Sequence, residues 1–555
     1  MSKKKRTKAP FLGTTTYFFC SNCYSPLLDS KCCLCNQYGV EFFTSPPGDL
    51  YIAFEAYYNF IESAVMKTIK VKLPRDFVYL LNKIPVSNKT ADEVYFLNKR
   101  LGVLFFDSLS KEFTFKFDEF GLKFFLSLLF LESSYDFDEI KKNIKYVSVD
   151  DCARDKISRG ANILAPGIIE KTDFNEGDYV IVLHEDRIIA LGKAKINASE
   201  IKRRGIVLKN VFSATITISD LKEIAKNIER IREVIKGLSK GITLSSKSIL
   251  SLEEYNPWKY IPPEAADHLK VIIAANRCTL ERLAKDAVSF IRRYLKKGAI
   301  VSFSGGKDSS CTLDLVIQAR IPFIVIFADT GLEFPETTAY VAKILEKIGG
   351  TFQLQSKVNT IEIYKNEKAI VVRRNEKVFW TLAKHLGFPA MDFRWCCKVC
   401  KFIPIRTALS KINVVNNKMI VGTRRYESFL RKRQKRIEFN RWTRTYNYHP
   451  IQEWPALAVW LYVFLRQIPT NPLYKLGFHR LGCWLCPSSE YLEISLLEEL
   501  HPELWKKLEE FFITILPNKT RDEVREIIRS GIWRKTSESA NIIPRKLNIL
   551  DLIKS

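Results

Sequence analysis

The segment 299–320 joins a short apolar run to a glycine-containing loop and then to a helical pattern. Residues 299–303 are apolar and β-rich, and the loop that follows has the sequence Ser-Gly-Gly-Lys-Asp-Ser. Residues 311–320 have helical character. A strand, a glycine loop and a helix in this order direct backbone N–H groups towards a phosphate. The segment therefore predicts a nucleotide-binding turn in an α/β domain; an ordinary strand-to-helix turn is the alternative.

Each residue type in this loop suits phosphate binding. The glycines allow backbone conformations and a close approach that a side chain would block. The lysine supplies a positive charge, and the serine hydroxyls can donate hydrogen bonds to phosphate oxygens. The spacing differs from that of a Walker A loop. The predicted phosphate-binding residues are Ser304, Gly305, Gly306, Lys307, Asp308 and Ser309.

The net charge of +26 restricts the partners of this 555-residue chain. Such a surplus favours nucleic acid or an anionic membrane, although the Lys- and Glu-rich composition of a thermophilic protein would also raise the basic count. The most apolar stretch, 120–131, is short and contains Lys123, so we expect a buried helix there. The basic N-terminus lacks the apolar core of a secretory signal. We therefore expect a cytoplasmic protein whose partner is nucleic acid and not a membrane.

Most of the thirteen cysteines fall into three tight clusters. In a chain with no export signal, such clusters indicate metal or redox chemistry and not disulfides. The first has the pattern Cys-x2-Cys-x8-Cys-x2-Cys, which suits tetrahedral Zn²⁺ in a small zinc ribbon with a structural role. Its predicted ligands are Cys20, Cys23, Cys32 and Cys35, with Cys33 as a spare or competing ligand. The isolated Cys152, Cys278 and Cys311 lie in apolar contexts and are expected to be small core residues.

Several further motifs follow the glycine loop in a fixed order. They occupy residues 327–337, 422–431, 449–454, 469–474 and 480–483. Together with the loop, they resemble the phosphoadenosine phosphosulfate (PAPS) reductase family, which belongs to the PP-loop ATP pyrophosphatases, over roughly residues 295–490. The resemblance implies an α/β domain with a doubly wound, mostly parallel sheet that binds an adenine nucleotide, either ATP or PAPS or adenylyl sulfate (APS).

The resemblance also points to residues beyond the loop. Asp329 follows a strand-like run, a position where doubly wound folds place ligands, so it could hold Mg²⁺ or a ribose hydroxyl. The arginines of the 422–431 motif could clamp phosphate or sulfate, although some of this very basic segment must be solvated surface. The predicted nucleotide-binding residues outside the loop are Asp329, Gly422, Arg424, Arg425 and Arg431, and the predicted catalytic set is Lys307, Asp308, Asp329 and Arg425.

One departure from the family bears on the chemistry. The reductases use a nucleophilic cysteine in a C-terminal Glu-Cys-Gly motif, but this sequence has no cysteine after Cys486. We therefore expect ATP-dependent adenylation of an RNA base, with tRNA as the expected RNA and sulfur transfer as the following step. A PAPS or APS reductase, and an RNA-binding protein with a regulatory nucleotide site, are the alternatives.

The other two cysteine clusters form a second candidate metal site. Their pattern, an adjacent pair and a distant Cys-x-x-Cys, resembles the 4Fe–4S ligands of adenylylsulfate reductases and related enzymes. Four thiolates are the usual ligands of such a cluster, but Zn²⁺ uses the same set. The candidates are Cys396, Cys397, Cys400, Cys483 and Cys486, of which four are expected to be ligands.

Residues 146–211 resemble a PUA domain, a small RNA-binding β-barrel. The distinctive part is the stretch 159–167, Arg-Gly-Ala-Asn-Ile-Leu-Ala-Pro-Gly. Glycines there would allow the backbone to approach a sugar-phosphate chain, and basic side chains would contact phosphates. The predicted RNA-binding residues are Arg154, Arg159, Gly160, Gly167 and Lys193. A small barrel without a nucleic-acid role is the alternative.

The expected organisation has seven parts. They are a basic tail at 1–11, the zinc ribbon at 12–45, an unassigned α+β domain at 46–145, the PUA-like domain at 146–215, a helical connector at 216–294, the PP-loop domain at 295–490 and a C-terminal helical extension at 491–555. The sequence leaves open the RNA target, the sulfur or electron donor and the oligomeric state.

Overall fold

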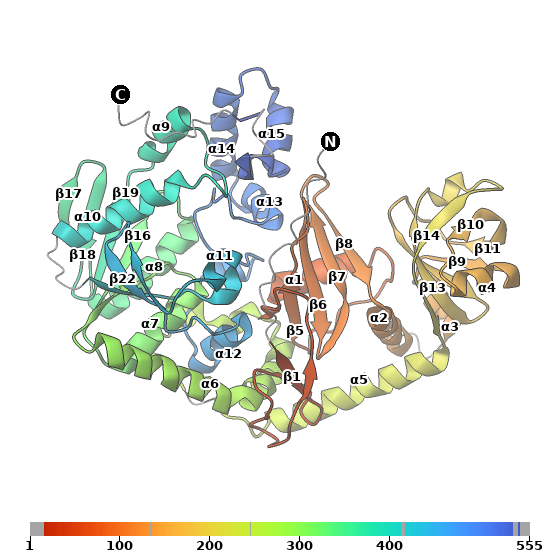
Figure 1. Cartoon of the computed structure of the whole chain (residues 1–555). Helices are drawn as coiled ribbons and strands as arrows, with labels where there is room; N and C mark the ends of the chain where they lie inside the picture. Colours follow the sequence, from red (N-terminus) through yellow and green to blue (C-terminus); the bar gives the residue numbers. More distant parts are fainter. Residues whose placement is uncertain (1–15, 133–135, 245, 412–416, 537–541, 544–555) are drawn as a thin grey trace.

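The computed structural model describes residues 16–132, 136–244, 246–411, 417–536 and 542–543 of the chain. Within this part, the strands form four separate sheets, of three, five, six and eight strands. Figure 1 shows the eight-stranded sheet at the left, the five-stranded sheet in the middle and the six-stranded sheet at the right, with two long helices along the bottom. The three-stranded sheet lies at the foot of the central sheet.

The eight-stranded sheet contains the glycine loop. Its spatial order is β17-β18-β19-β16-β15-β20-β22-β21, in which β19, β16, β15, β20 and β22 run parallel and the other strands pair antiparallel. The strands are β15 (Ala299–Ser302), β16 (Phe323–Asp329), β17 (Gln353–Val358), β18 (Ile361–Lys365), β19 (Ala369–Arg374), β20 (Lys418–Val421), β21 (Ile437–Asn440) and β22 (Thr445–Tyr448). The chain moves outward from β15 on one side and returns on the other, so the sheet is doubly wound and mostly parallel, as predicted.

The order of the parallel strands marks the expected ligand site. When the five parallel strands are numbered by their order in the chain, their order across the sheet is 3-2-1-4-5, so the winding reverses between β15 and β20. In open α/β sheets, ligands bind beyond the carboxyl ends of the strands at such a reversal. The glycine loop leaves the end of β15 at this point. The helices of this unit are α7 (Lys307–Ala319), α8 (Pro335–Gly349), α9 (Lys377–Leu386), α10 (Ile403–Lys411), α11 (Phe429–Lys432) and α12 (Ala456–Arg466).

The segment 46–145, unassigned by its sequence, forms an antiparallel sheet with helices. Its order is β4-β5-β6-β7-β8. The strands are β4 (Tyr51–Ile52), β5 (Tyr79–Lys83), β6 (Thr90–Phe96), β7 (Lys99–Asp107) and β8 (Glu112–Phe117), and the helices are α1 (Glu55–Val65), α2 (Glu119–Glu132) and α3 (Phe137–Lys142). Helix α2 contains the apolar stretch 120–131 and is buried, as expected. All seven residues of β6 are buried, since this strand lies in the middle of the sheet.

The six-stranded sheet belongs to the PUA-like segment. Its order is β10-β14-β13-β12-β9-β11. The strands are β9 (Tyr146–Val149), β10 (Ile163–Leu164), β11 (Ile168–Lys171), β12 (Tyr179–His184), β13 (Arg187–Ala194) and β14 (Ile206–Ile216), with helix α4 (Asp151–Ser158) beside them. The pair β12 and β13 is the hairpin expected from the sequence. This unit has a small hydrophobic core of its own around Val147, Val180 and Leu208.

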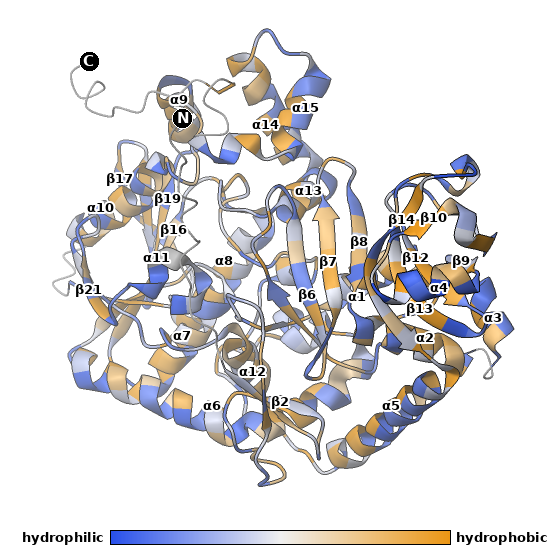
Figure 2. Cartoon of the chain, turned by 45° about the vertical axis from the view of Figure 1, so that its right-hand side comes forward, coloured by the Kyte–Doolittle hydropathy of each residue, from blue (hydrophilic) through white to orange (hydrophobic). Residues whose placement is uncertain are grey.

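Two long helices connect the units. They are α5 (Ile218–Ser239) and α6 (Ala266–Leu295), and α5 alternates hydrophobic and hydrophilic residues along its length (Figure 2). The three-stranded sheet of β1 (Tyr17–Cys20), β2 (Ser25–Leu27) and β3 (Val40–Phe42) rests on α6, where Asn276 receives a hydrogen bond from Leu28 N at 2.8 Å and donates one to Pro26 O at 2.8 Å. Helices α13 (Tyr491–Leu500), α14 (Pro502–Ile515) and α15 (Arg521–Arg529) end the described chain.

The ribbon, the five-stranded sheet and the eight-stranded sheet share one continuous hydrophobic core. It includes Tyr17 of the ribbon, Phe77 ahead of β5 and Trp460 of α12. A shared core fixes the positions of these units, so residues far apart in sequence can form one site. No helix in the described part of the chain combines the length and apolar character that crossing a bilayer requires.

Candidate functional site

The glycine loop turns sharply between β15 and α7. Gly305 has φ +76°, in the left-handed region that favours glycine, and a Cβ there would lie 2.9 Å from Val341 Cγ2. Ser309 Oγ donates to Gly306 O at 2.8 Å and accepts from Ser304 N at 3.2 Å. These bonds hold the loop in the conformation that presents the N-terminus of α7.

A buried charge network lies directly beneath the loop. Lys307 Nζ lies 2.8 Å from Asp308 Oδ2, and Arg424 Nε donates to Asp308 Oδ1 at 2.6 Å. Arg424 Nη1 also contacts both carboxylate oxygens of Asp49, at 3.0 and 2.9 Å. Asp49 in turn accepts from Ala456 N, at the N-terminus of α12, at 2.6 Å. One arginine thus joins α7 to the end of β20 and to the N-terminal part of the chain.

Burial sets the electrostatics of this network. Burial by itself disfavours the Asp308 carboxylate, but the charges of Arg424 and Lys307 outweigh it and lower its pKa to about 2. Burial lowers the pKa of Lys307, against the opposing effect of Asp308. Asp308 therefore stays ionised at neutral pH and fixes both cations.

Two further contacts shape the loop. Lys307 N donates to Tyr474 Oη at 3.0 Å. One of the N–H groups that a phosphate would use is therefore hydrogen-bonded to this tyrosine. Gly422, directly after β20, passes so close to α7 that a Cβ would lie 2.6 Å from Asp308 O and 2.7 Å from Thr312 Oγ1. Only a glycine fits this close approach.

The predicted arginines divide into three environments. Arg424 is almost fully buried and holds the network above. Arg425 is partly exposed, and its Nη2 lies 2.9 Å from Glu453 Oε1, so its catalytic role stays a prediction. Arg431 pairs with Glu427 but also faces other arginines. Burial, followed by the charge of Arg480, lowers the pKa of Arg431 to about 10.

We call the set of Arg394, Arg424, Arg431 and Arg480 the arginine group. It lies between the loop and the second cysteine set. Arg424 and Arg394 also lower the pKa of Arg431 through their charge, whereas Asp308 raises it. Arg394 Nη2 lies 3.8 Å from Cys486 Sγ, and its Nε has no hydrogen-bond partner although it is buried. Like charges gathered around one guanidinium favour a bound anion such as phosphate or sulfate.

Asp329 ends β16, as predicted, and both of its carboxylate oxygens accept hydrogen bonds from within the protein. Its Oδ2 accepts from Arg373 Nε at 2.8 Å and its Oδ1 from Gly331 N at 2.9 Å. With Glu333 and Arg374, these residues line a cavity of about 470 Å³. This cavity therefore lies along the same carboxyl edge of the sheet as the loop, at the ends of β16 and β19.

Four of the five cysteines in the second set influence one another. The pKa of Cys397 is lowered to about 5, first by a hydrogen bond from Cys396 and also by the charge of Arg394. Burial, followed by the charge of Glu333, raises the pKa of Cys483, and the charges of Cys486 and Cys397 raise it further. Glu333 Oε1 accepts from Thr330 Oγ1 at 2.9 Å, and Thr330 Oγ1 lies 3.3 Å from Cys483 Sγ. The four thiols Cys396, Cys397, Cys483 and Cys486 thus face one site.

Cys400 differs from these four. It is buried on the short helical turn after Cys397, and burial raises the pKa of its thiol to about 11. Of the other cysteines, only Cys397 affects its pKa, and the neighbouring charge is that of Arg374. Its placement favours Cys396, Cys397, Cys483 and Cys486 as the four ligands among the five candidates.

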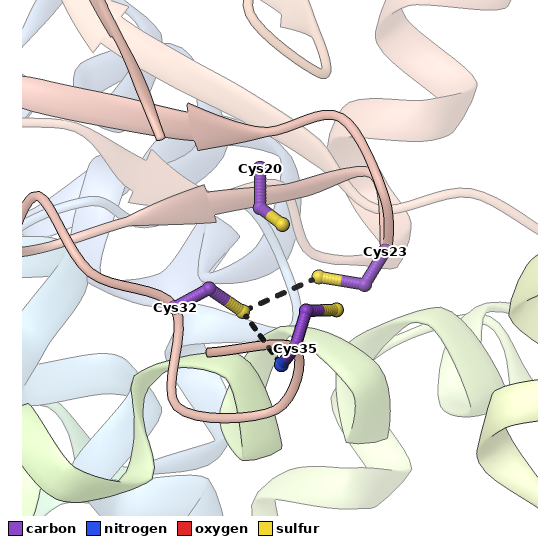
Figure 3. Close-up of side chains that lie close together, drawn as sticks. All are labelled: Cys20, Cys23, Cys32 and Cys35. Atoms are coloured by element: carbon purple, nitrogen blue, oxygen red, sulfur yellow. Dashed lines mark hydrogen bonds between the residues drawn. The ribbon is translucent and has the colours of Figure 1, made fainter. Parts of the chain in front are cut away.

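The first cysteine set has the geometry of a single metal ion (Figure 3). The ligand atoms of Cys20, Cys23, Cys32 and Cys35 all lie within 4.8 Å of one another, and no other such group of three or more occurs in the described residues. Cys23 Sγ and Cys32 Sγ are 3.6 Å apart. Tetrahedral Zn²⁺ with Zn–S bonds of about 2.3 Å would space its sulfurs by about 3.8 Å. The residues of the first set therefore fit zinc.

The spare thiol of the ribbon has another partner. Cys33 Sγ accepts from Cys278 N of α6 at 3.1 Å, so it turns away from the four ligands. Cys278 and Cys152 are both exposed, and the expectation that they lie in the core is wrong. Each lies on the outer face of an amphipathic helix, beside charged residues such as Asp151 and Arg277. Cys311 is buried in α7, as expected.

The predicted RNA-binding residues lie on α4, in the loops that follow it and on β13. Arg154 pairs with Asp151 and Asp155, and Arg159 ends α4 and is exposed. Gly160 lies in open space, whereas a Cβ on Gly167 would lie 2.6 Å from Ala153 Cβ. Gly167 therefore serves the packing of its loop on α4, and its approach to RNA stays a prediction. Lys193 is exposed on β13.

Several site residues had no signal in the sequence. Asp49 follows a Pro-Pro pair in the segment without a motif, and only the shared core brings it to Arg424. Arg394 lies two residues before the paired cysteines, with Trp395 between them. His479 lies among cations: burial and then the charges of Lys83 and Lys307 hold its pKa well below the usual range. A basic residue beside a predicted cluster is a signal that could have identified Arg394.

Comparison with known proteins bears directly on these features. A model of the phosphoadenosine phosphosulfate reductase domain matches residues 298–489, and a model of the PUA domain matches residues 145–212. An uncharacterised protein of Methanocaldococcus jannaschii is 29% identical over 534 residues, covering 94% of this chain and 97% of the relative.

Two other relatives are similar over shorter ranges. A second uncharacterised protein of Methanocaldococcus jannaschii is 33% identical over 328 residues, covering 57% of this chain and 71% of the relative. An adenosine 5'-phosphosulfate reductase of a Geobacillus species is 28% identical over 211 residues, covering 37% of this chain and 79% of the relative. Together with the glycine loop on a doubly wound sheet, these matches show that residues 298–489 form a domain of the phosphoadenosine phosphosulfate reductase family and that residues 145–212 form a PUA domain.

Proposed function

We propose that this protein is an ATP-dependent enzyme that adenylates a base of RNA, with tRNA as the expected substrate, in preparation for sulfur transfer. The observation that carries the proposal is the arginine group between two sites. Arg431 feels the charge of Asp308 in the loop network, and Arg394, which also faces Arg431, contacts Cys486. A nucleotide site and a four-thiol site therefore share one wall. The PUA domain match supports RNA as the partner.

The reaction would begin with attack by a carbonyl oxygen of the base on the α-phosphorus of ATP. The bond to the bridging oxygen breaks, pyrophosphate leaves and the base is left as its adenylate. The loop N–H groups and Lys307 would hold the phosphates, and Arg431 with Arg480 would neutralise the charge that develops on them. Asp329, beside its cavity, is the carboxylate placed to hold Mg²⁺ or the ribose.

The second step would replace oxygen by sulfur. A sulfur nucleophile attacks the adenylated carbon and AMP leaves with the original carbonyl oxygen. The second cysteine set offers four thiols that face one site, which is the number of thiolate ligands that a 4Fe–4S cluster uses. When bound, such a cluster could supply a site for sulfur or electrons. The hydrogen bond from Cys396, and then the charge of Arg394, lower the pKa of Cys397 and favour its thiolate form, which is the form that binds metal.

The test is ATP turnover by anaerobically purified protein. With α-³²P-ATP and total tRNA, we expect pyrophosphate and an equal amount of label, as adenylate on the RNA or as AMP released from it, and both should depend on RNA. The variant to compare with the wild type is Arg431→Gln, which removes the charge that would face the phosphates while keeping a polar side chain. ATP that is bound but not cleaved, with and without RNA, would contradict the proposal and leave a regulatory nucleotide site.

The family match favours a reductase as the second candidate. A sulfate-activated adenine nucleotide would fill the same loop and arginine group, and a relative of that activity is 28% identical over the shared domain. Sulfite release from PAPS or APS with thioredoxin as the reductant would establish this alternative. RNA-dependent formation of AMP without release of sulfite would decide for adenylation.

A further inference from the structure

A second cavity lies far from the nucleotide loop, between the five-stranded sheet and the PUA domain. It has a volume of about 450 Å³. Its floor includes the half-buried rings of Phe105 on β7 and Tyr179 on β12. Four lysines line it, Lys89 and Lys116 from the five-stranded sheet and Lys193 and Lys209 from the PUA domain. We call this cavity the lysine cleft.

The charges of the lysine cleft are largely uncompensated. Lys89 Nζ lies 2.8 Å from Asp107 Oδ2. Lys116, Lys193 and Lys209 have no carboxylate within ion-pair distance in the described part of the chain. Burial, and then the charges of Lys89, Lys195 and Lys116, lower the pKa of Lys193. Lysines from two separate units therefore repel one another across one cavity, and a polyanion would relieve that repulsion.

The cleft includes residues of the PUA domain. Lys193, predicted from sequence to contact RNA, is one of its lining residues, and its Nζ lies 5.7 Å from the centre of the Tyr179 ring. Exposed lysines around aromatic rings are suited to a nucleotide chain, because phosphates pair with the amines and bases can stack on the rings. A protein partner would need paired carboxylates at this spacing.

We propose that the lysine cleft binds the phosphate backbone of the RNA, so that the five-stranded sheet is a second RNA-binding surface beside the PUA domain. This inference rests on the RNA partner of the proposed function. The sheet order is β4-β5-β6-β7-β8, with the cleft at β7 and β8. At the opposite edge, Asp49 precedes β4 and contacts Arg424 of the loop network.

The sheet therefore separates the cleft from the nucleotide site by a fixed distance. Its five strands, spaced about 4.8 Å apart, span about 19 Å. That span is close to the width of an RNA duplex. An RNA held in the cleft would place a nearby unpaired base within reach of the nucleotide loop, and the intervening sheet would act as a rigid spacer.

The test compares two double variants of the full-length protein. Lys116→Ala with Lys209→Ala removes one unpaired lysine from each wall of the cleft. Lys384→Ala with Lys506→Ala removes the same charge from exposed positions on α9 and α14, away from the cleft (Figure 1). Binding of fluorescent tRNA is measured from low to high salt, with the Tm of each variant as the check on folding.

For the cleft variant we expect a loss of about tenfold in tRNA affinity and a slope of log K against log salt that is shallower by about two. The control variant should bind like the wild type. Unchanged affinity and slope in the cleft variant would overturn the inference and leave RNA binding to the PUA domain. A wild type that does not bind tRNA would overturn the inference together with the RNA part of the proposed function. The assay of RNA-dependent AMP formation distinguishes failure of the inference from failure of the proposed function, because this activity persists when only the inference is wrong.

Discussion

At the scale of single residues, Asp308 determines how the loop is charged. It lies between Lys307 and Arg424, so removing either cation leaves the other to keep the carboxylate ionised. The two cations are nevertheless unequal. Arg424 is committed to Asp49 and Asp308, whereas Lys307 has one carboxylate partner and lies on the first turn of α7. Lys307 is therefore the cation free to turn towards a phosphate.

We predict that Lys307→Ala weakens ATP binding by about 10- to 100-fold, because a charge-assisted hydrogen bond contributes about 1.5–3 kcal/mol. Isothermal titration calorimetry measures the affinity. Lys384→Ala, an exposed lysine on α9, provides the control for a lost positive charge. Equal affinity in wild type and Lys307→Ala would show that the nucleotide binds elsewhere.

A second residue-scale prediction concerns pH. His268 is completely buried on α6, where Nδ1 accepts from Val78 N at 3.0 Å. Burial lowers its pKa to about 4. The folded state therefore binds a proton less readily than the unfolded state, whose histidine has a pKa near about 6.5. Stability should fall as the pH drops from about 6.5 towards 4, by up to about 3 kcal/mol.

Calorimetry of the wild type and His268→Asn between pH 7 and pH 4.5 measures this effect. Asparagine keeps an acceptor for Val78 N but does not titrate. Both proteins contain the same zinc thiols, so the difference in Tm isolates the histidine. The gap between the two Tm values should shrink or reverse as the pH falls; a constant gap would contradict the assignment.

At the level of single residues, the sequence pattern predicted those site residues that belong to a recognisable motif. The loop and Arg424 meet as expected, because both follow parallel strands and the carboxyl ends of those strands share an edge. Asp49 could not be found this way. Its position depends on packing between units far apart in sequence, and no local pattern records such a contact.

At the scale of elements, the site depends on how closely β20 approaches α7. Gly422 makes this approach possible, since a Cβ would meet backbone and side-chain atoms of α7. We predict that Gly422→Ala lowers the Tm, with a cost of about 1–3 kcal/mol, and weakens ATP binding, because the end of β20 must move away from the loop.

The matched control is Gly237→Ala on α5. A Cβ at that position meets nothing within 4 Å, and alanine is the better helix former, so the Tm should stay the same or rise slightly. ATP affinity should not change. A Gly422→Ala protein with wild-type Tm and affinity would show that the strand and helix can separate without consequence.

Elements with a strong periodic pattern were predicted well, and the others were not. The β15 strand, the hairpin of β12 and β13, and helix α2 match their sequence signals. The five-stranded sheet of 46–145 escaped because its strands have mixed burial and no motif, and β4 has only two residues. Its contact with the loop network, through Asp49 and Arg424, follows from tertiary packing alone.

At the scale of the whole molecule, the two cysteine sets lie in different structural contexts. The ribbon set is held on α6 through Cys33 and Asn276, away from the loop. The second set lies beside the arginine group and Glu333. A metal lost from the first set should therefore loosen the ribbon, whereas a metal lost from the second should affect the reaction and leave the ribbon folded.

Metal analysis of anaerobically purified variants tests this separation. The wild type should contain about one zinc and about four iron atoms per chain. Cys483→Ala should lose the iron and the visible absorption but keep the zinc, and Cys23→Ala should lose the zinc and keep the iron. Cys400→Ala, the odd member of the second set, should keep both. Iron that survives in Cys483→Ala but not in Cys400→Ala would assign the fourth ligand to Cys400. Two zinc ions and no iron would make both sets structural, and the sulfur would then have to come from a separate donor protein.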